Sequence, residues 1–102
     1  MPDQIRVVMF KDGDIWVAQC LEFDIGAQGK DLDQLHARLV IAINLELQES
    51  LKVNGKPFAG IDPAPAQYER MWGQRSGAFK PVRPLRVGDD GQTVDLEIAL
   101  AA

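Results

Sequence analysis

Residues 14–51 read DIWVAQCLEFDIGAQGKDLDQLHARLVIAINLELQESL, two short strand patterns followed by one long helical pattern. Asp31 followed by Gln34 resembles a capping box, in which side chains satisfy the free N–H groups at a helix start. No Gly or Pro interrupts residues 32–52, which predicts a helix of about 20 residues. Its apolar stripe is wide enough to lie across a sheet, and consists of Leu32, Leu35, Leu39, Val40, Ala42, Ile43, Leu47 and Leu51.

Two apolar runs before this helix are typical of paired strands. Residues 5–11 and 15–21 flank Asp12-Gly13, a dipeptide that favours tight hairpin turns because both positions tolerate positive φ. One face of the sheet should meet the helix, and the other should be covered by the rest of the chain or by an oligomer partner. The second run is apolar on both faces, namely Ile15, Val17 and Leu21, and opposite them Trp16, Ala18 and Cys20.

The sequence of residues 5–51, about half of the chain, resembles that of a known family. The pattern is similar to the HicB-like antitoxin domain family. The resemblance implies a small sheet of three antiparallel strands, a helix packed on it and one further strand. It rests on Gly13, the run WVAQCLE at residues 16–22, Ile25, Gln28-Gly29 and the helix from Leu32.

The resemblance also implies a role for the domain. In that family the domain masks the active site of a small toxin ribonuclease, so that catalysis belongs to the partner. Asp31 stands where the family usually has Thr, a chemically acceptable change at a helix cap. The family's DNA-binding appendage has no counterpart in this sequence, so the resemblance carries no DNA-binding role here.

Length and composition predict one globular domain over residues 1–102, with 46% hydrophobic and 25% charged residues. Cys20 is the sole cysteine, so neither a disulfide framework nor a cysteine-based zinc site is expected. No apolar run approaches the roughly 18 residues of a membrane span, and the first residues lack signal-peptide features. We therefore expect a cytoplasmic protein without membrane contact.

Charge is distributed unevenly along the chain, whose formal net charge is −4. Residues 1–51 carry four basic against nine acidic residues, residues 52–86 carry seven against two, and residues 87–102 carry none against four. The basic segment 52–86 either packs across the acidic unit of its own chain or a twin, or meets RNA, DNA or an acidic partner. An acidic chain overall argues against strong nonspecific nucleic-acid binding.

The connection at residues 52–80 contains signals for a helix end and a new helix start. Asn54-Gly55 predicts the end of the long helix, and Asp62-Pro63 predicts a short helix reaching Trp72, with Asp as its cap. The large side chains on and after this helix are candidate partner-binding residues: Tyr68, Met71, Trp72 and Phe79. Alternatively, the cluster on the short helix is a lid over the long helix or the open sheet face.

The C-terminal segment at residues 82–101 has the pattern of a hairpin or strand. Two prolines confine residues 80–87 to an edge strand or an extended arm. Residues 92–101 alternate strictly, which predicts a strand with one buried face. Across this hairpin, Arg83 or Arg86 is expected to pair with Asp95 or Glu97. The buried face should consist of Val94, Leu96, Ile98 and Leu100.

Catalytic patterns are weak in this sequence. The acids Asp12, Asp14, Glu22 and Asp24 form a possible carboxylate cluster, although turn and loop roles are the simpler interpretation. His36 has no Cys or second His nearby, so no metal site is expected. An enzyme is not expected, because no base, nucleophile or metal set is visible; the alternative left open is a carboxylate-only hydrolase that uses Asp24 and Asp31, and no cofactor is expected.

These observations predict an α+β fold. An antiparallel sheet of four or five strands, in the order β-β-β-α-(short α)-β-β, should carry one long helix on one face. The expected parts are a HicB-like core unit at residues 5–51, a connection at 52–80 and a C-terminal hairpin or strand at 82–101. The predicted function is a non-catalytic, protein-binding module that masks a small basic toxin. The alternative is a stand-alone, self-associating domain, and a homo-oligomer is expected.

Overall fold

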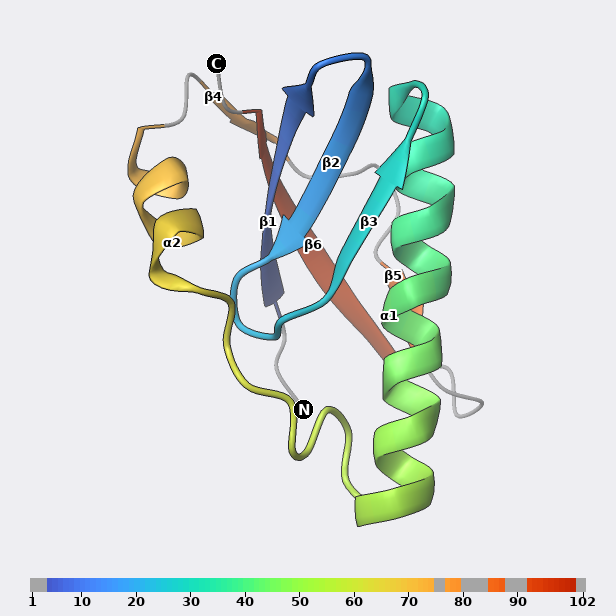
Figure 1. The fold of residues 1–102 in the computed structure, drawn as a ribbon. Coiled ribbons are helices and arrows are strands. Elements are labelled where there is room, and N and C mark those ends of the chain that lie inside the picture. Colours follow the sequence, from blue (N-terminus) through green and yellow to red (C-terminus); the bar gives the residue numbers. More distant parts are fainter. Residues whose placement is uncertain (1–3, 75–76, 80–84, 88–91, 101–102) are drawn as a thin grey trace.

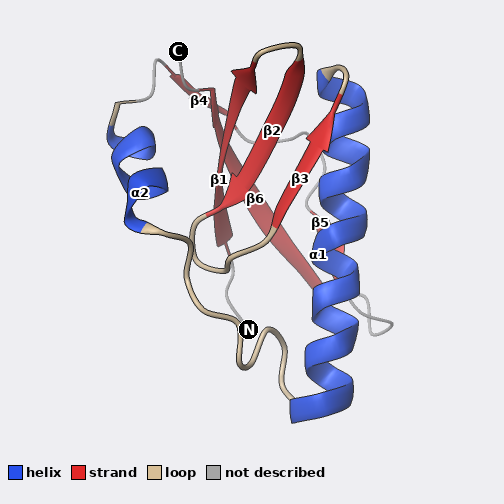
Figure 2. Cartoon of the chain, in the orientation of Figure 1, coloured by secondary structure: helices blue, strands red, loops and turns tan. Residues whose placement is uncertain are grey.

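The structure, a computed structural model, describes residues 4–74, 77–79, 85–87 and 92–100 as six strands and two helices. Figure 1 shows α1 and α2 on opposite sides of the sheet. Figure 2 shows β1, β2 and β3 between the two helices, and all three strands precede both helices in the chain. The elements are β1 (Gln4–Asp12), β2 (Ile15–Cys20), β3 (Gly26–Gly29), α1 (Leu32–Asn54), α2 (Ala66–Gly73), β4 (Gly77–Phe79), β5 (Leu85–Val87) and β6 (Gln92–Leu100).

The sheet is mixed. Its four main strands lie in the order β3-β2-β1-β6, and the short strands β4 and β5 pair antiparallel with β6. The predicted antiparallel sheet is confirmed for β1–β2 and β2–β3, but it is wrong for the central pair, because β1 and β6 are parallel. The chain passes through α1 and the long connection before β6, and such a crossover allows the last strand to enter in the direction of β1.

The first hairpin is confirmed, but its turn lies one residue later than the sequence predicts. Asp12 pairs with Ile15, so the two loop residues are Gly13 and Asp14. Gly13 has φ +63°, a conformation that costs glycine little. Glycine at the first loop position suits a two-residue hairpin connection, and Asp12 therefore belongs to the strand.

The core lies between α1 and the inner sheet face, which we define as the face that α1 covers. Leu35, Leu39, Ile43 and Leu47 of the predicted stripe are buried there, whereas Leu32 and Leu51 near the helix ends are exposed. Each buried aliphatic side chain contributes about 1.5–3 kcal/mol of transfer free energy. The sheet residues of the inner face include Ile5, Val7, Met9, Trp16, Ala18, Cys20, Val94, Leu96 and Ile98.

Both ends of α1 follow the predicted signals. The Asp31 carboxylate accepts a hydrogen bond from the Gln34 N–H at 2.8 Å. The Gln34 amide oxygen in turn accepts from the Lys30 N–H at 2.8 Å. Side chains therefore bind one backbone N–H before the helix and one in its first turn, as in a capping box. At the other end Gly55 adopts φ 72° and donates its N–H to the Leu51 carbonyl, as expected for a left-handed C-cap.

The chain after α1 returns to the sheet through a buried aromatic contact. The Phe58 ring stacks on Phe23 with ring centroids 4.6 Å apart. Phe58 has φ 58°, which is unusual for a bulky residue, and its N–H donates to the Ser50 hydroxyl at 2.8 Å. The buried hydroxyl donates to the Leu47 carbonyl, so this connection is held to the helix that it has just left.

The second helix begins later than predicted. Asp62 does not cap it, because α2 starts at Ala66 after Pro65. The Asp62 carbonyl instead accepts from the Asp24 N–H at 2.7 Å, and the Ala64 N–H donates to the Leu21 carbonyl at 3.0 Å. Residues before proline avoid helical backbone angles, so Pro63 and Pro65 keep this segment extended.

The C-terminal strands agree with the predicted hairpin. Leu85 lies opposite Val94, and Val87 lies opposite Gln92. Arg83 and residues 88–91, which join the two halves of the predicted hairpin, fall outside the described residues. β4 is a strand within the predicted connection at 52–80 that the sequence reading missed, because Gly77–Phe79 is too short to show a period. The alternation in β6 is confirmed for Val94, Leu96 and Ile98, which are buried, but Leu100 is only half-buried and Ala99, predicted on the exposed face, is buried as well.

The contact between β3 and α1 leaves no room for a side chain at Gly29. A Cβ atom placed there would lie 2.7 Å from the Leu35 nitrogen and 2.9 Å from its Cα, both of which are backbone atoms. We expect Gly29→Ala to lower the free energy of unfolding by about 1–3 kcal/mol, because the helix must move. Urea denaturation followed by circular dichroism measures this loss.

The matched control is Gly73→Ala in α2, where an added Cβ meets nothing within 4 Å. Its free energy of unfolding should stay within about 0.5 kcal/mol of the parent. Equal losses for both variants would contradict the close approach of α1 and β3.

Candidate functional site

The outer sheet face, opposite α1, carries the densest cluster of polar contacts among the described residues. Along β1 the residues that point to this face are Gln4, Arg6, Val8 and Phe10, alternating with the core residues. Val8 is fully buried, while Arg6 and Phe10 are half-buried. α2 lies on this side of the sheet (Figure 1), so it covers part of the outer face.

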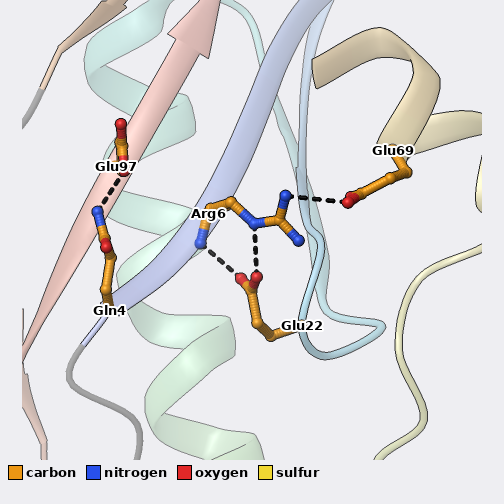
Figure 3. Close-up of polar contacts among 5 residues, drawn as sticks. All are labelled: Gln4, Arg6, Glu22, Glu69 and Glu97. Carbon is orange, nitrogen blue, oxygen red and sulfur yellow. Dashed lines mark hydrogen bonds and ion pairs between the residues drawn. The ribbon is translucent and has the colours of Figure 1, made fainter. Parts of the chain in front are cut away.

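Arg6 is the centre of the cluster (Figure 3). Its Nε lies 2.6 Å from Glu22 Oε2, and its backbone N–H donates to Glu22 Oε1 at 2.7 Å. Its Nη1 lies 3.0 Å from Glu69 Oε1 on α2, and its guanidinium carbon lies 5.6 Å from the centre of the Trp72 ring. One side chain therefore connects β1, the loop after β2, and α2.

The electrostatics of this cluster favour a charged arginine and leave the surface acidic. The hydrogen bond to Glu22 is the main cause that raises the pKa of Arg6, with Glu69 adding to it and burial opposing it. Gln4 donates a hydrogen bond to Glu97 of β6 beside the cluster. Two carboxylates, Glu22 and Glu69, therefore bind the Arg6 guanidinium, and a third, Glu97, lies beside them on β6.

The structure brings two of the predicted partner-binding residues, Tyr68 and Trp72, into contact with this same face. The Tyr68 ring lies 6.3 Å from the Phe10 ring, and Trp72 lies against Arg6. Tyr68, Met71 and Trp72 are all half-buried, so each combines a contact with its own chain and an exposed part. Phe79 lies in β4, opposite Ile98 of β6. Of the two alternatives, the contacts of Tyr68 and Trp72 agree with a lid on the outer sheet face, and their partner-binding role stays a prediction.

The sequence analysis missed Arg6 and Glu69, and it assigned Glu22 to a carboxylate cluster rather than to an ion pair with Arg6. The alternation of β1 signals that Arg6 faces away from the core, but nothing local identifies partners 16 and 63 residues away. The acidic segment 1–51 and the basic segment 52–86 do meet here, but each contributes a residue of its minority charge to the ion pair. The acid Glu69 comes from the basic segment, and the base Arg6 comes from the acidic one.

The possible carboxylate cluster is not assembled. Asp12 ends β1 and Asp14 lies in the hairpin turn, whereas Glu22 and Asp24 follow the far end of β2, about 20 Å away for a six-residue strand. Asp24 accepts from the Gln19 amide at 2.9 Å. Asp31 caps α1, as described above, so the two acids of the hydrolase hypothesis both have structural partners.

His36 and Cys20 are the side chains that the sequence offers as a metal ligand and a nucleophile. His36 is exposed on α1. Within the described part of the chain, no three His, Cys, Asp or Glu residues gather closely enough to hold a metal ion. Cys20 is fully buried, and this burial, with a smaller contribution from Glu22, raises its pKa to about 12. The thiol is therefore protonated and inaccessible in the folded chain.

Comparisons of the chain with protein-family models, with curated protein sequences and with solved structures find no match. The resemblance to HicB-like antitoxins therefore stays a hypothesis based on the residues themselves. Among the helices that the structure describes, none combines the length and apolar character needed to cross a membrane.

Glu22 and Glu69 should differ in their contributions to stability. Glu22 makes two hydrogen bonds to Arg6 and its side chain is 30% exposed, whereas Glu69 makes one and is 58% exposed. We expect Glu22→Ala to cost about 1–2 kcal/mol and Glu69→Ala less than about 1 kcal/mol, because exposed pairs are screened by water. Urea denaturation of both variants, with Arg6→Ala and the double variants, gives the two coupling energies. A larger coupling for Glu69 would contradict this ranking.

The buried thiol should make stability depend on alkaline pH. An unfolded cysteine titrates near pH 8.5, whereas Cys20 in the folded chain titrates at about 12. Between these values the unfolded chain loses a proton that the folded chain keeps, so stability falls as pH rises, by at most about 1.4 kcal/mol per pH unit. Comparing the parent with Cys20→Ala isolates this slope, which should be shallower in the variant. Parallel pH profiles for the two chains would show that Cys20 is accessible.

Proposed function

We propose that this protein is a non-catalytic, protein-binding module of the HicB antitoxin kind, which masks a small basic ribonuclease toxin. The element order supports the proposal. Three antiparallel strands are followed by a helix packed on the sheet and later by a further long strand, which is the arrangement that the resemblance implies. In this proposal the protein acts in the cytoplasm and has no DNA-binding or cofactor-dependent activity of its own.

The observation that carries the proposal is the combination of charge and large side chains on one face. Glu22 and Glu69 bind Arg6, and Glu97 accepts from the neighbouring Gln4, so carboxylates outnumber the guanidinium in this cluster. Such a field attracts a basic partner and increases its association rate. Half-buried Tyr68, Met71 and Trp72 lie on the same side, and aromatic and Met side chains are enriched at protein interfaces.

In this proposal the domain inhibits the toxin by covering its RNA-binding surface and by pairing with the basic residues there. A toxin ribonuclease binds RNA phosphates with basic residues, and carboxylates presented on a rigid surface compete for those residues. Arg6 holds α2 to the sheet, so the acidic and aromatic groups are preorganised before the partner arrives. The binding free energy is then not reduced by the cost of ordering this helix.

A self-associating domain without a toxin is the second candidate function. Ile41 and Leu45 favour it, because these aliphatic side chains are 59% and 61% exposed on α1. Exposed apolar side chains on neighbouring helical turns are typical of a surface that contacts another protein. The two functions are distinguished by whether a different protein accompanies the chain.

The test is a native pull-down of the protein from its own cells at moderate salt, with light scattering on the eluate. We expect a stoichiometric small basic protein that dissociates as salt is raised, because the contacts are charged. Recovery of the chain alone, free of other chains and of RNA, would overturn the antitoxin proposal.

Two charge reversals locate the binding face. Glu69→Lys should reduce retention of the partner by about tenfold or more, since it replaces attraction with repulsion next to Arg6. Glu46→Lys makes the same charge change at an exposed position of α1, away from α2, and should have little effect. Equal losses with both variants would assign the effect to net charge rather than to the α2 face.

A further inference from the structure

The outer side of α1 carries a stripe that the fold leaves uncovered. Ile41 and Leu45, one helical turn apart, are more exposed than most large apolar residues of the described chain, at 59% and 61%. They point away from Leu39 and Ile43, which are buried against the sheet. The apolar character of α1 is therefore two-sided, and one side has no partner within the chain's described residues.

The spacing of this stripe is that of a helix-pairing seam. Its members recur at alternating intervals of three and four residues, as the inward positions of coiled coils do. All of them are exposed. The middle of the stripe is aliphatic, and its ends are polar or charged. In chain order it consists of Arg38, Ile41, Leu45, Gln48 and Lys52.

We propose that this stripe, the α1 seam, binds the α1 seam of a second copy of the chain, with the two helices antiparallel about a two-fold axis level with Ile43. In this arrangement Ile41 packs on Leu45 of the partner subunit, and Leu45 packs on Ile41 of the partner subunit. A two-fold interface must be complementary to itself, and this register satisfies that requirement for the apolar pair.

The charges select the antiparallel direction. Arg38 and Glu49 are three helical turns apart, so they lie on the same side of the seam. A two-fold axis keeps that side, and in the register that pairs Ile41 with Leu45 it brings Arg38 to within one residue's rise, about 1.5 Å along the axis, of Glu49 of the partner subunit. A parallel pair would instead put Arg38 and Glu49 of the partner subunit on opposite sides of the seam, so they could not pair, and would place Lys52 against Lys52, which is repulsive.

The present contacts of Arg38 are compatible with this role. One guanidinium nitrogen donates to the Gln28 carbonyl at 3.1 Å, which leaves its other donors available. The residue is exposed, as is Glu49. The contact with β3 restricts the arginine side chain, so less conformational entropy is lost when it meets a carboxylate.

The size of the seam sets the strength of the pairing. Residues 34–52 span about 27 Å of helix, and a single helix pair buries less than the roughly 800 Å² per partner of a standard interface. We therefore infer a dimer that dissociates in the micromolar range. The α1 seam lies on the other side of the sheet from α2 (Figure 1), so the dimer does not depend on the proposed toxin and leaves both acidic faces accessible.

The experiment is sedimentation equilibrium of the purified full chain over a micromolar concentration series. The parent should fit a monomer–dimer equilibrium, and Leu45→Glu should raise its dissociation constant by at least about tenfold by placing a charge in the apolar centre. Val53→Glu is the matched control, since Val53 is 67% exposed on the same helix but lies off the seam. It should leave the dissociation constant unchanged, and thermal denaturation should show both variants folded.

A charge exchange tests the direction of pairing. Glu49→Arg alone should weaken the dimer, because it faces Arg38 of the partner subunit, and adding Arg38→Glu should restore it. A parent chain that stays monomeric throughout the series would overturn the proposal, as would a Leu45→Glu variant that dimerises like the parent. If the dimer forms but the charge exchange fails to rescue it, the antiparallel register is wrong.

Discussion

Burial of β1 on both faces is the constraint on which the rest of this structure depends. Its inner face packs Ile5, Val7 and Met9 against α1, while Val8 on the opposite face is equally buried. The strand is also paired on both edges, with β2 and with β6. A strand enclosed in this way requires a cover on each side of the sheet, and α1 supplies only one. The returning connection and α2 supply the other, with Arg6 as the polar link between the two layers.

Local patterns were sufficient to predict both ends of α1 and the last strand of the sheet. The Asp31 cap, the Gly55 helix end and the alternation in β6 each depend on residues that are neighbours in the sequence, and each is found. The parallel pairing of β1 with β6 could not be predicted in the same way. Periodicity identifies a strand but not its neighbour, and the direction of β6 is set by the path of the whole chain after α1.

The candidate site shows the same division between local and non-local information. The helical spacing of Tyr68 and Trp72 predicted that they share a side, and the structure places both over β1. The charged groups beside them come from three separate segments, and the ion pair between Arg6 and Glu69 joins residues 63 positions apart. Spacing rules reach only one or two helical turns, so such a cluster emerges only when the sheet and α2 are in place.

The contact of Arg38 with the Gln28 carbonyl has a consequence for the open edge of the sheet. β3 is the terminal strand, and an exposed strand edge is a template onto which foreign chains can add. Here the edge is only four residues long, one of its carbonyls is already occupied by a guanidinium, and Gly29 lies directly against the backbone of α1. The first turns of α1 thus hinder the addition of a further strand to the β3 edge of the sheet, which lowers its tendency to aggregate.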